Sequence, residues 1–159
     1  MTNITIEKNS ASELELTFTR TFDAPRELVW KAWTETNLLE RWFYPRDFKV
    51  TFCQGDLRPG GKWRTGMRSP EGTEHICGGE YREVLPLSKL VFTHAWEGEK
   101  GDLDHQTLVT VTFFDENEKT LMRFEQTGFS SVESRDGHED GWTGAFYNLS
   151  TYLGKDEAR

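Results

Sequence analysis

The sequence predicts an α+β fold in which one antiparallel sheet of about seven strands is covered by a long C-terminal helix. Three observations carry this prediction. Apolar and polar residues alternate near the N-terminus, strand-like segments separated by turn residues fill positions 48–129, and a helical stripe of apolar residues follows. At 159 residues the chain is expected to form a single domain, 1–159, with its core at 14–153.

The N-terminal third predicts one strand and two short helices. Residues 14–21 alternate between apolar and polar side chains, which is typical of a half-buried strand. Asp23–Pro25 predicts a helix start, because a capping residue precedes a proline that suits the first turn. Residues 28–33 place their apolar side chains at helical spacing. A second short helix is expected over Asn37–Phe43 and is ended by Pro45.

The middle of the chain predicts six further strands joined by short turns. Ser69–Gly72, Pro86–Ser88 and Asp115–Glu118 supply the turn residues. Short connections favour an antiparallel arrangement. The expected strands are Phe48–Phe52, Lys62–Arg68, Glu74–Val84, Lys89–Trp96, Gln106–Asp115 and Lys119–Thr127.

The C-terminal segment predicts the long helix. Its apolar stripe consists of Trp142, Ala145, Phe146, Leu149 and Leu153. Ser130 with Glu133 predicts a capping box at the start, and Gly154 predicts the C-cap. Gly141 and Gly144 are expected to let the helix approach the sheet closely. Because a strongly twisted sheet cannot lie flat on one helix, we expect a cleft between them.

Composition excludes several classes of function. The net charge is −8, from 19 basic and 27 acidic residues, which disfavours nucleic-acid binding. No apolar run is long enough for a membrane span, and Met1–Ser10 lacks the features of a signal peptide, so we expect a cytoplasmic protein. Cys53 and Cys77 are expected to be free thiols. The histidines and cysteines lack metal-binding spacing, and no nucleotide-binding or serine-hydrolase motif is present, so neither a metal nor a cofactor is expected.

Several segments together resemble a known family. They are Thr19–Trp30, Leu39–Trp42, Gly60–Trp63, Gly79–Val84, Lys89–Thr93 and Gly141–Trp142. The sequence resembles homologues of the C-terminal domain of the heat-shock-protein-90 (Hsp90) ATPase activator, within the START-like, Bet v 1-like (SRPBCC) superfamily. The resemblance implies a helix-grip fold, in which the sheet wraps around the C-terminal helix. It also implies either a cavity for varied apolar ligands or a chaperone-associated role in the stress response, and it carries over no catalytic residues.

The implied pocket lies between the sheet and the C-terminal helix. Strand parity selects the side chains that point inward, although a β-bulge would reverse part of a strand. Trp33 and Trp42 are expected to close one end of the pocket. The ligand-binding residues predicted in this way are Trp63, Met67, Tyr81, Phe92, His94, Trp96, Phe113, Phe124 and Gln126 from the strands, with Trp142 and Phe146 from the helix.

Three polar residues in this set have two interpretations each. His94 is either a general acid–base or ligand-binding imidazole, or a ring that fills aromatic space. Gln126 either hydrogen-bonds a ligand or is satisfied by water or Tyr81. The Tyr81 hydroxyl either orients a ligand or belongs to the core.

Three functional hypotheses follow. The first is the binding of a small apolar ligand, aromatic or lipid-like, by a monomer or weak dimer. The second is an interaction module that assists a chaperone or another protein. The third is a cyclase- or hydrolase-like enzyme that uses His94, with Tyr81 or Gln126 polarising a carbonyl.

Overall fold

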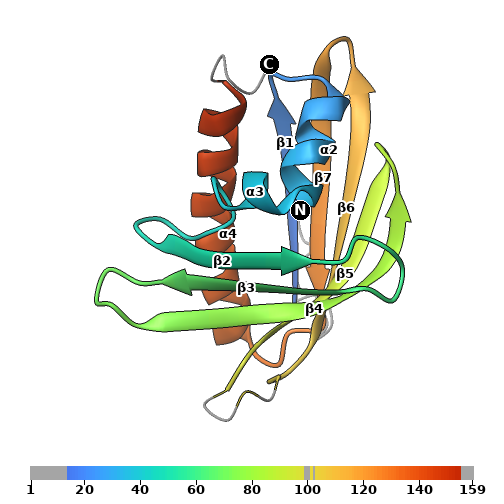
Figure 1. The fold of residues 1–159 in the computed structure, drawn as a ribbon. Helices are drawn as coiled ribbons and strands as arrows, with labels where there is room; N and C mark the ends of the chain where they lie inside the picture. The colour runs from blue at the N-terminus through green and yellow to red at the C-terminus, as the bar shows by residue number, and fades with distance from the viewer. Residues whose placement is uncertain (1–13, 99–100, 102, 155–159) are drawn as a thin grey trace, which may run out of the picture.

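The described part of the chain forms a sheet of seven antiparallel strands with one long helix along its concave side (Figure 1). The structure, a computed structural model, describes residues 14–98, 101 and 103–154. The elements are β1 (Glu15–Phe22), α2 (Arg26–Thr34), α3 (Thr36–Leu39), β2 (Lys49–Gly55), β3 (Lys62–Arg68), β4 (Glu74–Leu85), β5 (Lys89–Trp96), β6 (Thr107–Glu116), β7 (Lys119–Thr127) and α4 (Val132–Leu153). The predicted α+β class and helix-grip arrangement are confirmed, whereas Met1–Ser10 lies outside the described residues.

The sheet has its first and last strands side by side, and two register shifts bend it. The order is β1-β7-β6-β5-β4-β3-β2, so the first strand of the chain pairs with the last. In Figure 1 the strands β2 to β4 cross the view, while β1 and β7 run alongside α4. Register shifts interrupt the β2–β3 pairing between Val50 and Phe52 and the β4–β5 pairing between Tyr81 and Glu83. Such bulges increase local twist and bend the sheet around the helix.

Several helix boundaries differ from the prediction, whereas the predicted C-cap of α4 at Gly154 is confirmed. The N-cap of α2 is Pro25, and no side chain caps it, so the expected cap at Asp23 is wrong. Helix α3 is a single turn that ends at Leu39. Helix α4 is capped by Ser131 in place of Ser130, because the Ser131 hydroxyl accepts a hydrogen bond from the backbone N–H of Ser134 at 3.0 Å. That spacing is the N-cap to N3 geometry.

Two glycines of α4 differ in their surroundings. A methyl group added at Gly144 would lie 2.7 Å from the backbone nitrogen of Arg46, whereas one added at Gly137 would meet nothing within 4 Å. The close approach at Gly144 is therefore to the loop after α3, and not to the sheet as the sequence suggested. At Gly141 the nearest atom to such a methyl is Cγ of Pro45, at an ordinary 3.7 Å.

This difference predicts opposite effects of the same substitution. Gly137→Ala is expected to raise the free energy of unfolding by up to about 1 kcal/mol, because alanine favours the helix. Gly144→Ala is expected to lower it, because the backbone of Arg46 would have to move. Urea unfolding of both variants and the wild type measures the two shifts. Shifts of the same sign would contradict the packing of α4 against this loop.

Candidate functional site

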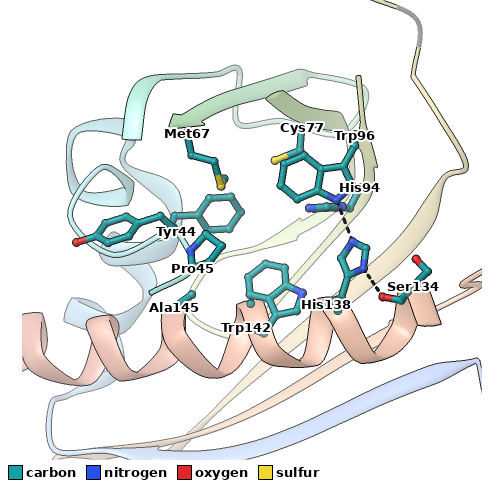
Figure 2. A pocket seen from close by; sticks show the side chains of 13 residues that line it. Tyr44, Pro45, Met67, Cys77, His94, Trp96, Ser134, His138, Trp142 and Ala145 are labelled. Carbon is teal, nitrogen blue, oxygen red and sulfur yellow. Dashed lines mark hydrogen bonds between the residues drawn. The ribbon is translucent and has the colours of Figure 1, made fainter. Parts of the chain in front are cut away.

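A cavity of about 300 Å³ lies between α4 and the strands β3 to β5 (Figure 2). Its volume is at the lower end of the range of ~300–1,000 Å³ that is usual for ligand pockets. The loop after α3 contributes Phe43, Tyr44 and Pro45 to its lining. Asn148 of α4 donates a hydrogen bond to the carbonyl oxygen of Tyr44 at 3.1 Å and so holds this loop against the helix.

One face of α4 forms the helical wall of the cavity. Ser134, His138, Gly141 and Ala145 line it at intervals of four, three and four residues. Side chains at this spacing lie above one another on a helix. Gly137 and Gly141 contribute no side chains to this wall, which makes room for the cavity.

The strands supply apolar and aromatic side chains. Met67 of β3, Cys77 of β4, and His94 and Trp96 of β5 line the cavity. Burial raises the pKa of the Cys77 thiol, so this side chain is a neutral, apolar wall element. Among the described residues that line the cavity there is no aspartate, glutamate, lysine or arginine.

Trp142 lines the cavity and also packs against the aromatic core. Its ring centroid lies 4.7 Å from that of Phe124 and 5.5 Å from that of Phe146. Its indole N–H donates to Oε1 of Gln126 at 2.7 Å, and the Gln126 amide donates to the hydroxyl of Thr107 at 2.8 Å. The Thr107 hydroxyl in turn donates to the carbonyl oxygen of His94 at 3.0 Å. This buried chain ties α4 to β7, β6 and β5.

His138 is held in one protonation state by its two neighbours. The indole N–H of Trp96 donates to Nε2 of His138 at 3.0 Å, and Nδ1 of His138 lies 2.7 Å from the carbonyl oxygen of Ser134 (Figure 2). An indole nitrogen only donates and a carbonyl oxygen only accepts. The ring must therefore be neutral, with its proton on Nδ1. Burial also lowers the pKa of His138.

His94 is a buried titratable group of the site with a strongly lowered pKa. Its side chain is only 4% exposed, and its ring centroid lies within 6 Å of those of Trp63, Trp96 and His138. Burial, together with the nearby His138, lowers the pKa of His94 to about 3. The imidazole is therefore neutral at physiological pH.

Comparison with protein families identifies the fold family. Residues 23–154 match the model of the family described as activator of Hsp90 ATPase homolog 1-like protein (AHSA1). The chain belongs to this family. The match covers the region from the end of β1 to the end of α4, which includes every residue that lines the cavity.

Solved structures show the same AHSA1-like architecture. A protein of Nitrosomonas europaea is 26% identical, with a TM-score of 0.78 over 93% of this chain and 99% of that chain. A protein of Arthrobacter aurescens is 25% identical, with a TM-score of 0.83 over 95% of this chain and 92% of that chain. The AHSA1 protein of Silicibacter pomeroyi, at 22% identity and a TM-score of 0.79 over 87% and 96% of the two chains, shares the fold. No curated protein sequence matches significantly.

The structure divides the eleven predicted ligand-binding residues of this AHSA1-like protein into three groups. Met67, His94, Trp96 and Trp142 line the cavity. Trp63, Tyr81 and Phe92 line a separate void of about 20 Å³ beside α3, together with Trp33. The remaining four are buried in the core and line neither space: Phe113, Phe124, Gln126 and Phe146.

The polar groups of Gln126 and Trp42 have protein partners, whereas the Tyr81 hydroxyl lies beside the small void. Gln126 is satisfied by Trp142 and Thr107, and not by Tyr81. Burial raises the pKa of Tyr81 to about 12, so its hydroxyl stays protonated beside the small void. Trp42 donates its indole N–H to the carbonyl oxygen of Ala32 at 2.9 Å and is completely buried, away from the cavity.

Sequence reasoning missed His138, Cys77 and the loop of Phe43–Pro45. His138 lies four residues before Trp142, so extending the apolar stripe by one turn towards the N-terminus would have found it. Nothing in the local pattern indicated the loop, because its position depends on packing against α4. Among the described residues, no group of histidine, cysteine or acidic side chains is placed to hold a metal ion. No described helix is long and apolar enough to cross a membrane.

Proposed function

We propose that this AHSA1-like protein binds a small, uncharged, apolar ligand, preferably aromatic, in the cavity between α4 and β3–β5. The observation that supports this proposal is the lining itself, in which Met67, Cys77, Trp96 and Trp142 surround about 300 Å³ beside a tightly packed core. Aromatic walls favour aromatic ligands through edge-to-face and stacked contacts. A carboxylate ligand would find no lysine or arginine among the described lining residues.

Ligand titration with a cavity-filling variant tests this function. Propylbenzene is expected to raise the melting temperature, by about 3–5 °C for each tenfold increase in concentration above Kd. Gly141→Leu is expected to abolish this shift, because the leucine side chain projects from a lining position with room for its Cβ. The fold should survive, since leucine favours helix more than glycine does.

Thr143→Leu is the matched control, because Thr143 is exposed on the same helix and does not line the cavity. It should respond to propylbenzene as the wild type does. The function fails if propylbenzene and other small aromatic hydrocarbons leave the melting temperature of the wild type unchanged. It also fails if Gly141→Leu keeps the full shift.

A second candidate function is chaperone assistance. The description of the matching family as activator of Hsp90 ATPase homolog 1-like supports it. The role predicts that the protein increases the ATPase rate of an Hsp90 chaperone in a purified assay. An unchanged rate at saturating protein would remove this candidate.

The proposal does not include acid–base catalysis by His94. A general base works best when its pKa lies near the operating pH. The pKa of His94, lowered to about 3, makes this imidazole a weak base at neutral pH. We also propose that residues 14–153 act as one domain in a reducing, cytoplasmic setting, which suits the free thiols of Cys53 and Cys77.

A further inference from the structure

A second cavity lies directly beside the first. It has a volume of about 390 Å³, and its described lining includes Asp104 and His105 before β6 and Ser134 and His138 at the start of α4. His94, Trp96, Ser134 and His138 line both cavities. The two spaces therefore share a wall that consists of these four residues.

The shared wall is closed by a contact between side chains. The Trp96 indole of β5 donates to the His138 imidazole of α4, and both side chains are only partly buried. Breaking this hydrogen bond and turning the two rings requires no change in the hydrogen bonds of the sheet. Exposed and partly exposed side chains change rotamer rapidly compared with backbone rearrangements. Opening of this wall would therefore leave the hydrogen bonds of the sheet unchanged.

The two cavities differ in chemistry. The first is lined by Met67, Cys77, Trp142 and other apolar groups. The second is lined by the polar residues Asp104, His105 and Ser130, which are exposed to solvent. No lysine or arginine is among the described residues that line it. A head group that donates a hydrogen bond suits this side, whereas an anion would face the carboxylate without a compensating cation.

We propose that the second cavity is a polar subsite of the same binding site, and that the ligand joins an aromatic body to an uncharged hydroxyl head that passes the Trp96–His138 contact. This proposal rests on the proposed function. Asp104 accepts the hydrogen bond that the hydroxyl donates. His94, which borders both cavities, lies at the junction between the body and the head.

Three probes with one carbon skeleton test the subsite: propylbenzene, 3-phenylpropan-1-ol and 3-phenylpropanoate. Isothermal titration of the wild type should give an affinity for the alcohol at least about fivefold above that for the hydrocarbon, consistent with one net hydrogen bond. The carboxylate should bind most weakly. Asp104→Asn is expected to raise the affinity for the carboxylate at least about threefold and to leave the hydrocarbon unchanged, because it removes the opposing charge.

Two further variants complete the design. Asp115→Asn removes an exposed carboxylate that lines neither cavity, and it should behave as the wild type. Trp96→Phe removes the indole N–H that closes the wall. The hydroxyl head should then pass this contact more easily, so the ratio of alcohol to hydrocarbon affinity should rise.

The outcomes separate the two proposals. If no probe binds, the proposed function fails and the subsite fails with it. If the hydrocarbon binds but the alcohol is within twofold of it, or Asp104→Asn does not differ from Asp115→Asn, only the polar subsite is overturned.

Discussion

Trp142→Ala is expected to lower the free energy of unfolding by about 3–5 kcal/mol, the usual range for removing a buried tryptophan or phenylalanine side chain. The Trp142 side chain is almost fully buried and packs against Phe124 and Phe146. The substitution also removes the hydrogen-bond donor to Gln126, which is completely buried. Urea unfolding followed by circular dichroism measures the change.

A conservative variant separates packing from hydrogen bonding. Trp142→Phe keeps an aromatic ring but loses the N–H and part of the indole. Leaving the Gln126 amide oxygen unsatisfied should by itself lower the free energy of unfolding by about 1–3 kcal/mol. In a Gln126→Leu background, Trp142→Phe should lower the free energy of unfolding by less than it does in the wild type, because the amide oxygen of Gln126 is absent. Additive effects of the two substitutions would show that the hydrogen bond contributes nothing measurable.

The protein is expected to lose stability steeply between pH 6.5 and about 3. In this range the unfolded chain protonates His94, whose ordinary pKa is 6.5, while the folded protein keeps it neutral because its pKa is lowered to about 3. The unfolded state then binds more protons, so acid favours unfolding. The stabilising effect of the neutral ring is fully present above pH 6.5 and falls by up to about 1.4 kcal/mol per pH unit below it.

His94→Phe provides the control for this pH dependence. A somewhat larger aromatic ring replaces the imidazole and the titrating group is removed. Between pH 7.5 and 5 the variant should therefore lose about 2 kcal/mol less stability than the wild type. His138 adds to the slope in both proteins, since burial lowers its pKa too. Parallel pH profiles for the wild type and His94→Phe would show that His94 titrates alike in the folded and unfolded states.

The regular elements could be predicted because their signals are local. Strands β3, β5 and β7 have the predicted bounds, since turn residues lie next to them in the sequence. The alternation of side chains along these strands also predicted which of them point inward. Trp63, Met67 and Phe92, predicted in this way, are buried. Helix caps were harder to predict, because Ser130 and Ser131 both suit an N-cap and tertiary packing selects one of them.

The position of the cavity could not be read from parity alone. Phe124 and Phe146 satisfy every criterion for a pocket wall, yet Phe18, Trp33 and Trp142 fill the space around them. Inward-pointing aromatic rings can either line a cavity or fill the core. Which of the two occurs depends on how the loop of Tyr44–Pro45 and the glycines of α4 fit together. Those contacts join distant parts of the chain, and no spacing pattern encodes them.

The pairing of β1 with β7 has a consequence for synthesis on the ribosome. Glu15 pairs with Thr127 and Phe22 with Thr120, so the first strand finds its partner only after nearly the whole chain has emerged. Until then the apolar side chains of Leu16, Phe18 and Phe22 have no sheet to cover them. Such long-range pairing slows folding and exposes nascent chains to aggregation. We therefore expect the yield of native protein to depend on translation rate and on chaperones that hold the emerging N-terminal strand.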